Sequence, residues 1–322
     1  MTLQNNKDKI LVSVLFVVCF ILLYNLSFTT SYSYDSNYAN VTIDTTVNIT
    51  NSKPKITAVI ISEGVGAFET ITLSAGRTRQ IHCNATIVDW DGYGDINSTN
   101  ATFWDDNNAD MSSPDDNNNH YFNSSCSFVK NTGLYTAVYK CTLKVYYYAN
   151  NGSNWVCNVT TVDDYYFSKP NTNYTDSLSN TTTLSALYAI NLSNTLLDYG
   201  DVAVEDYSSE VSMDVVNFGN MAVNISVSGY AETPGDGLAM TCSLNGNISL
   251  DNERYTINSG TAFGSMTQLT GTDINIGGVQ IAHQILDGTP VTNSTYWKLY
   301  IDPTNVPAGI CNGTIVFSAT IP

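Results

Sequence analysis

The tetrapeptide pattern Cys-Asn-x-Thr occurs three times in this chain, and each copy constrains the fold in two ways. The copies begin at Cys83, Cys157 and Cys311. Because side chains alternate between the faces of a β-strand, a cysteine pointing into a core turns the next Asn and the later Thr outward. The inner residue suits a disulfide, and the outer pair is an N-glycosylation acceptor. The pattern therefore predicts two-sided strands in an oxidising compartment.

Acceptor triplets of the Asn-x-Ser/Thr type recur along the chain, 16 times in 322 residues. Their overlap with cysteine at the three copies favours true glycosylation over a composition that is simply rich in Asn and Thr. We predict outward-facing glycans on a set of strand and turn positions. These are Asn84, Asn158, Asn312, Asn151, Asn224, Asn247 and Asn293.

Seven cysteines are present, and Cys19 lies inside an apolar N-terminal segment. The other six are an even number, as a disulfide framework requires. Four fall in the first half of the chain and two in the second, and no zinc-type Cys/His spacing occurs. We predict that each half closes its own bridges, through Cys83, Cys126, Cys141, Cys157, Cys242 and Cys311.

The N-terminus has the features of an export signal. Lys7 and Lys9 precede a mostly apolar run of 15 residues, from Ile10 to Tyr24. This length is typical of a signal peptide and short of the roughly 20 residues that span a bilayer. Residues 1–33 are therefore predicted to be either a cleaved signal peptide or a hydrophobic helix that anchors the chain in a membrane.

The net charge limits the classes of partner. Lys and Arg number 12 against 29 Asp and Glu, which gives a net charge of −17. Such a surface repels the phosphate backbone, so the composition argues against nucleic-acid binding. Other envelope proteins or glycans are the partners that an exported acidic protein would meet.

The polar and apolar pattern predicts an all-β protein of two tandem domains. Residues 34–54 are rich in Thr, Asn and Ser and are interpreted as a glycosylated stalk. Alternating apolar residues then predict a first β-sandwich over 55–166, with a hairpin turn at Asn150–Ser153. Residues 167–184 resemble a linker in composition, and 185–322 are predicted to form a second sandwich.

The first domain resembles the immunoglobulin fold. Cys83, Trp104 and the pair Tyr139-x-Cys141 follow the order of a strand B cysteine, a strand C tryptophan and a strand F cysteine. The resemblance implies an Ig-like sandwich with a Cys83–Cys141 bridge, which leaves Cys126 with Cys157. The pairing of Cys83 with Cys157 and of Cys126 with Cys141 stays open.

The second domain resembles repeats of cell-surface proteins. The segment Tyr199–Val202, a strand and the turn Asn217–Asn220 are similar to sandwich repeats of archaeal and Gram-positive surface proteins. The tail, residues 293–317, resembles uncharacterised secreted proteins of small-genome archaea. The resemblance implies a cell-surface location, two Ig-like sandwiches and no catalytic residue.

Two acidic loops and a pair of tyrosines are the candidate sites. Asp89, Asp91 and Asp95 surround Gly92 and Gly94, and spaced carboxylates in a tight turn can wrap Ca²⁺. The alternative for this loop is a solvated inter-strand connection, which is also the first interpretation of the aspartates in residues 105–116. Tyr146 and Tyr148 are predicted on an outward face, where they would stack on sugars or be covered by another strand.

We predict an exported, glycosylated surface protein with a structural, adhesive or binding role and no catalysis. One alternative is a carbohydrate-binding module. Another is a filament subunit that donates a strand to its neighbour, which requires an unpaired edge groove and an extended segment 34–54. A secreted hydrolase is least favoured, because the sequence has neither a Gly-x-Ser-x-Gly elbow nor a His-Glu-x-x-His motif.

Overall fold

The computed structural model describes residues 42–63, 70–164, 174–305 and 307–322. Contacts divide the chain into two units, residues 1–50 and residues 51–322. In the first unit, residues 42–50 form neither helix nor strand. The predicted signal peptide or anchor, residues 1–33, lies outside the described residues. Within the described ranges, no helix is long and apolar enough to cross a lipid bilayer.

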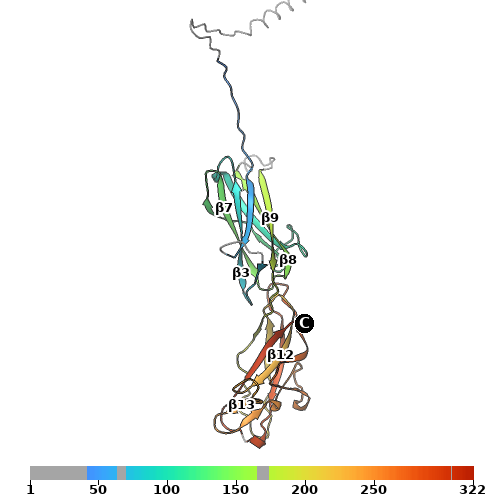
Figure 1. Ribbon diagram of the computed structural model, residues 1–322. Coiled ribbons are helices and arrows are strands. Elements are labelled where there is room, and N and C mark those ends of the chain that lie inside the picture. Colours follow the sequence, from blue (N-terminus) through green and yellow to red (C-terminus); the bar gives the residue numbers. More distant parts are fainter. Residues whose placement is uncertain (1–41, 64–69, 165–173, 306) are drawn as a thin grey trace, which may run out of the picture. The chain divides into compact units, whose positions relative to one another are not determined.

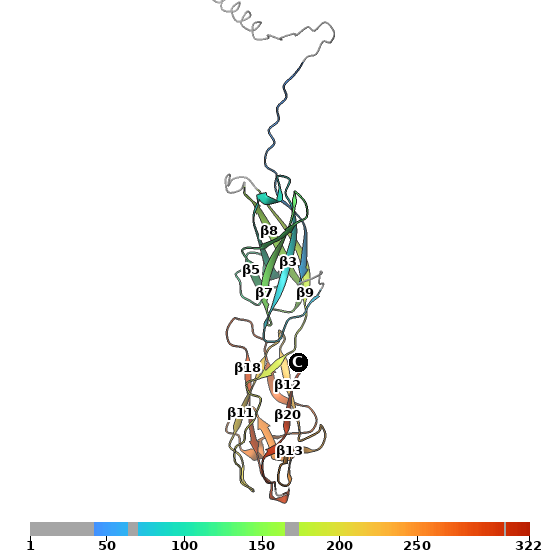
Figure 2. The same cartoon turned by 90° about the vertical axis from the view of Figure 1, so that its left-hand side faces the viewer.

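The second unit is all-β and contains two separate sandwich cores (Figures 1 and 2). In the first, one sheet has the order β1-β3-β7-β6 and the facing sheet the order β2-β9-β8-β4-β5. The strands of the first sheet are β1 (Lys55–Ser62), β3 (Thr78–Val88), β7 (Thr136–Tyr146) and β6 (Ser127–Asn131). Those of the second are β2 (Thr70–Ile71), β9 (Thr175–Leu184), β8 (Gly152–Asp163), β4 (Ile96–Asp105) and β5 (His120–Asn123).

Alternation of side chains explains why these segments are strands. In β3 the residues Ile81, Cys83, Ala85 and Ile87 are fully buried, while the residues between them are partly exposed. This two-residue period places one face of the sheet in the core. The facing sheet contributes Trp155, whose ring lies 4.7 Å from that of Phe103 and has no exposed surface.

The order of the strands corrects the predicted disulfides. Cys83 pairs with Cys157 and Cys126 pairs with Cys141, so the preferred Cys83–Cys141 bridge is wrong and the open alternative is observed. Cys83 and Cys141 are opposite neighbours within one sheet, whereas Cys157 reaches Cys83 from the facing sheet. The order β1-β3-β7-β6 against β9-β8-β4-β5 matches strands A-B-E-D against G-F-C-C′ of immunoglobulin domains, whose bridge joins B to F.

Three further sequence interpretations of this region are wrong. Residues 175–184 of the predicted linker form β9, which pairs with β8 along its length; its outer face is polar, so its composition resembles that of a linker. The predicted hairpin at Asn150–Ser153 is a crossover instead, because β7 and β8 belong to different sheets. On β4, Phe103 faces the core in place of the predicted Trp104, whose Nε1 donates to Asp106.

The second sandwich is built from three sheets. Their orders are β10-β11-β18-β15-β16, β17-β12-β20 and β14-β13-β19. The strands of the first sheet are β10 (Ile190–Leu192), β11 (Val211–Asn217), β18 (Thr292–Leu299), β15 (Glu253–Thr256) and β16 (Thr267–Gln268). The other two contain β17 (Ile274–Ile281), β12 (Val223–Tyr230), β20 (Thr314–Thr320), β14 (Asn247–Ser249), β13 (Leu238–Cys242) and β19 (Cys311–Asn312). The predicted Cys242–Cys311 bridge joins β13 to β19.

The turn Asn217–Asn220 connects two sheets of the second sandwich and also contacts the first. The Asn220 side-chain amide donates to the Ala149 carbonyl at 3.0 Å, and its oxygen accepts from the Leu187 backbone at 2.7 Å. Phe218 lies so close to Gly76, whose φ is +63°, that an added Cβ there would sit 2.5 Å from the ring. Glycine is thus required at this contact between the two sandwiches.

Candidate functional site

The first predicted site, the loop after β3, does bring its carboxylates together. Asp89, Asp91 and Asp95 each offer an oxygen, and these oxygens lie within 4.8 Å of one another. The loop is held against the turn before β7, because the backbone of Asp89 donates to the Tyr135 carbonyl and that of Tyr93 to the Leu134 carbonyl. The fold therefore fixes the cluster at one end of the first sandwich.

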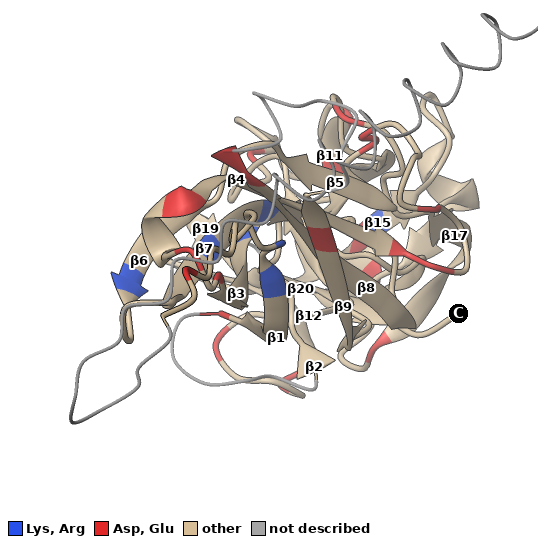
Figure 3. Ribbon diagram, turned by 90° about the horizontal axis from the view of Figure 1, so that it is seen from above, with Lys and Arg blue, Asp and Glu red and all other residues tan. Residues whose placement is uncertain are grey.

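Burial and neighbouring carboxylates act together on this cluster. The pKa of Asp89 is raised to about 6, mainly by burial and also by the carboxylates of Asp163, Asp95 and Asp91, against an opposing hydrogen bond from the Asp91 backbone. Burial and nearby aspartates also raise the pKa of Asp95. Acidic positions outnumber basic ones along the described ribbon (Figure 3), in keeping with the sequence.

The second acidic loop uses its carboxylates for its own turns. Asp116 accepts backbone hydrogen bonds from Asn118, Asn119 and His120 at 2.6–2.9 Å. Asp105 accepts from the side-chain amides of Asn107, Asn108 and Asn150. Asp106, Asp110 and Asp115 are exposed, as the solvated-loop interpretation predicts, whereas Asp105 at the end of β4 is 1% exposed.

The predicted glycosylation sites differ in exposure. Asn312 is exposed, and the others except Asn158 are partly exposed. Asn158 is only 7% exposed and donates to Ser179 Oγ at 2.9 Å, so the prediction of an outward, accessible acceptor is wrong there. Side chains of the adjacent β9 cover this face of β8. Glycan occupancy at all seven positions stays a prediction.

One of the two tyrosines proposed for sugar stacking is buried, and the other is partly exposed. Tyr148 is 1% exposed and packs edge-on against Tyr147 at 5.1 Å, whereas Tyr146 is half-buried. Tyr147 in turn contacts Phe218 of the second sandwich at 5.5 Å and donates to Gln284. The carbohydrate-binding alternative stays a prediction, because Trp90 and Tyr135 beside the first acidic loop are 68% and 43% exposed.

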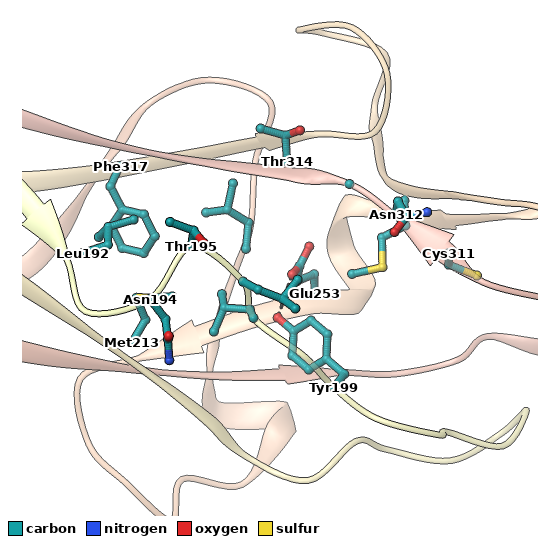
Figure 4. A pocket seen from close by; sticks show the side chains of 15 residues that line it. Leu192, Asn194, Thr195, Tyr199, Met213, Glu253, Cys311, Asn312, Thr314 and Phe317 are labelled. Carbon is teal, nitrogen blue, oxygen red and sulfur yellow. Dashed lines mark hydrogen bonds between the residues drawn. The ribbon is translucent and has the colours of Figure 1, made fainter.

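A groove that sequence reasoning missed runs along β20 in the second sandwich (Figure 4). A cavity of about 300 Å³ adjoins a wider depression of about 920 Å³, and the two share several lining residues. We call this the seam groove. Its apolar wall consists of Leu192, Leu196, Leu197, Met240, Ile315 and Phe317.

The seam groove exists because β20 is an edge strand whose inner side chains are incompletely covered. β20 pairs with β12 on one side, and no strand among the described residues pairs with its other side. Phe317 is paired with the buried Val227 and so faces the core, yet it is only partly buried. On β17, the opposite edge of the same sheet, Ile276, Val279 and Ile281 are each at most 4% exposed. The sandwich is thus closed on the β17 side and open on the β20 side.

A buried carboxyl group lies in the wall of the cavity (Figure 4). Glu253, 1% exposed, accepts a 2.6 Å hydrogen bond from the Tyr199 hydroxyl. Burial raises the pKa of Glu253 to about 7, against the effect of that hydrogen bond. The pKa of Tyr199 is also raised, first by its own burial and then by Glu253.

Comparisons with known proteins show only distant similarity. No protein-family model and no curated protein matches the sequence. Among solved structures, one match is a chain of the CsuC–CsuE chaperone–tip adhesion subunit complex of Acinetobacter baumannii pili. It is 10% identical, with 81% of this chain and 100% of that chain covered and a TM-score of 0.34.

Two further structures have lower TM-scores. The CupB6 tip adhesin from Pseudomonas aeruginosa is 10% identical, with 84% of this chain and 93% of that chain covered and a TM-score of 0.27. The secreted serine protease VesC from Vibrio cholerae is 9% identical, with coverages of 78% and 49% and a TM-score of 0.18. The chain thus has a distant β-sandwich similarity to bacterial pilus tip adhesins.

Proposed function

We propose that this protein is an exported structural or adhesive surface protein that assembles by donating a strand from residues 41–50 to the seam groove of a second copy. Three closed disulfides support export, because such bridges persist in oxidising compartments. The open side of the second sandwich is the observation that carries the assembly proposal.

The proposed donor has the pattern that the groove requires. Between residues 41 and 49, every odd position is Val, Ile or Thr, and the even positions are polar. Of these, Ile43, Val47 and Ile49 are 82–83% exposed. As a strand beside β20, the segment would turn these side chains into the seam groove and Asn48 outward. Burying each would contribute about 1.5–3 kcal/mol.

The free edge of β20 supplies the other half of the interaction. An unpaired edge presents a row of N–H and C=O groups, and an added strand pairs with them regardless of its side chains. The side chains then fix the register, because a slip of one residue would turn the apolar face to solvent. Backbone pairing and apolar complementarity therefore favour the same occupant.

Chain length makes the donor a second copy. The Asn51 side chain bonds to Asp163, the last residue of β8, whereas the second sandwich bonds to Ala149, just before β8 begins. The 12 residues of β8 span about 40 Å, at about 3.3 Å per residue. The donor segment is covalently joined to Asn51 and, with ten residues, is shorter than β8 even when fully extended. It therefore cannot reach the groove of its own chain, which lies beyond the other end of β8.

Strand donation from each copy to the next leaves one free donor segment and one free groove at the ends of the assembly, unless the subunits form a ring. Donor and acceptor surfaces differ, so the contact is heterologous and generates an open chain of subunits or a ring. An assembly of this kind would serve as a surface filament or adhesive stalk. The proposal extends to two Ig-like sandwiches and an archaeal origin, which the sequence resemblances imply. It also extends to a retained N-terminal segment in the membrane, which rests on the apolar run from Ile10 to Tyr24, and to the absence of catalysis, which rests on the missing catalytic motifs.

The experiment compares two adjacent substitutions in the donor segment. Val47→Asp places a charge on the face that would enter the groove, whereas Thr46→Asp places it on the opposite face. We expect the full chain in detergent to form head-to-tail oligomers by analytical ultracentrifugation. Val47→Asp should remain monomeric because it would bury an unpaired carboxylate, and Thr46→Asp should assemble like the unmodified chain.

Two outcomes would overturn strand donation. One is an unmodified chain that stays monomeric at all accessible concentrations. The other is equal assembly of the Val47→Asp and Thr46→Asp variants, which would show that the alternating face is not used.

A further inference from the structure

One oxygen of a buried carboxylate at the end of the first sandwich has no hydrogen-bond partner. Asp89 has no exposed surface, and its Oδ2 accepts no hydrogen bond. Its Oδ1 accepts from the Asp91 backbone at 3.0 Å and lies 3.5 Å from Ser52 Oγ. A buried charged oxygen without a partner is costly, so the site requires an explanation.

The Asp89 carboxylate lies beside two further carboxylates and forms no ion pair with a Lys or Arg among the described residues. Oxygens of Asp91 and Asp95 lie with one of Asp89 in a group no more than 4.8 Å across. None of the Lys or Arg ion pairs among the described residues involves these three aspartates. This spacing allows the three oxygens to share one cation, and Ca²⁺ fits an irregular set of oxygen ligands better than Mg²⁺, which demands near-ideal octahedral geometry.

We propose that Asp89, Asp91 and Asp95 bind one Ca²⁺ ion. The ion supplies the missing partner of the buried Asp89 oxygen and neutralises the repulsion among the three carboxylates. Its remaining coordination positions are filled by water, as is common for Ca²⁺. This site lies outside the strand-donation proposal and does not depend on it.

The bound ion would also fix the start of the first sandwich. The Ser52 backbone N–H donates to the Asp91 carboxylate, and Asn51 Nδ2 donates to the neighbouring Asp163 at 2.7 Å. Residues 51 and 52 join the donor segment to β1, so Ca²⁺ held by Asp91 orders the point from which that segment leaves the sandwich.

The loop contains its own reporter for a test. Trp90 lies between two of the proposed ligands in the sequence and is 68% exposed. Tb³⁺ takes the same oxygen ligands as Ca²⁺, and excitation of a tryptophan this near produces Tb³⁺ luminescence. We expect a saturable signal of one Tb³⁺ per full-length chain that Ca²⁺ displaces far more effectively than Mg²⁺.

Matched variants assign the signal to the three aspartates. Asp91→Asn removes a ligand on the exposed side of the cluster and should weaken Tb³⁺ binding by about tenfold or more, since even outer partners of metal ligands contribute that much. Asp89→Asn should do the same, and Asp110→Asn in the second acidic loop should leave the affinity unchanged. Circular dichroism checks that each variant is folded.

Three results would overturn the assignment. They are a chain that shows no saturable Tb³⁺ signal, equal displacement by Mg²⁺ and Ca²⁺, and an Asp91→Asn variant that binds as tightly as Asp110→Asn. Loss of the site with assembly intact would separate this proposal from strand donation.

Discussion

Replacing Cys83 and Cys157 together by alanine is expected to lower the free energy of unfolding by about 4 kcal/mol. The bridge links residues 74 positions apart, and closing a loop of this length restricts the unfolded chain by about that amount. Both cysteines are fully buried and join the two sheets of the first sandwich. Urea unfolding monitored by tryptophan fluorescence, in a background where Trp297 of the second sandwich is replaced by Phe, measures the loss.

The matched control is the Cys126→Ala, Cys141→Ala pair, whose bridge spans 15 positions and should contribute about 3 kcal/mol. The single variant Cys157→Ala then tests the connectivity. Under denaturing conditions without reductant, a maleimide should label Cys83. Labelling of Cys126 instead would contradict the observed pairing.

Glu253→Gln is expected to stabilise the second sandwich above neutral pH. The pKa of Glu253 is about 7 in the folded protein against an ordinary value of 4.5, so the folded state keeps a proton that the unfolded chain loses. Stability therefore falls as the pH rises from about 4.5 to 7, by about 1.4 kcal/mol per pH unit and about 3 kcal/mol in total. Glutamine keeps the hydrogen bond with Tyr199 and has no charge to bury.

The comparison is made in the Val47→Asp background, so that assembly does not contribute to the unfolding free energy. At pH 4 the Val47→Asp chain should be about equally stable with Glu253 or with Gln at this position. At pH 8 the Glu253→Gln variant should be the more stable by about 3 kcal/mol. Glu232→Gln, on an exposed loop, should change neither value. Parallel pH profiles of the Glu253→Gln variant and its parent would show that Glu253 does not titrate in this window.

Local alternation predicted the buried faces of the first sandwich but not the partners of its strands. The pattern Ile81, Cys83, Ala85, Ile87 depends only on neighbouring residues, and all four are buried. Whether Cys141 or Cys157 faces Cys83 depends on which sheet each strand joins, and that is decided by contacts far apart in the sequence. The same limit made a crossover between β7 and β8 resemble a hairpin.

Polar composition makes β9 resemble a linker. β9 has mostly Ser, Thr, Asn and Asp because one of its faces is exposed, and its few inward residues, such as Leu184, give a weak signal. The stalk at 34–54 stays a prediction from its Thr and Asn content. Its odd positions 41–49 also carry the two-residue period on which the proposed donor strand rests.

The sequence alone predicts the cluster of carboxylates in the acidic loop, but it does not predict the seam groove. Asp89, Asp91 and Asp95 are close in the sequence, so a single tight turn is enough to gather them. The groove is formed by residues 192–199 and 311–317, which are over 100 positions apart. No local pattern marks Glu253 as buried beside Tyr199, because its environment is assembled from several strands.

Hydrogen exchange of the assembled chain tests strand donation most directly. Amide exchange would be measured by mass spectrometry on assemblies of the unmodified chain and on the Val47→Asp monomer. Two peptides should gain protection on assembly, residues 42–50 and residues 314–320, because each supplies one strand of the new pair. Exchange at the β17 edge, Ile274–Ile281, should stay the same. Assemblies in which residues 42–50 exchange as fast as in the monomer would rule out strand donation.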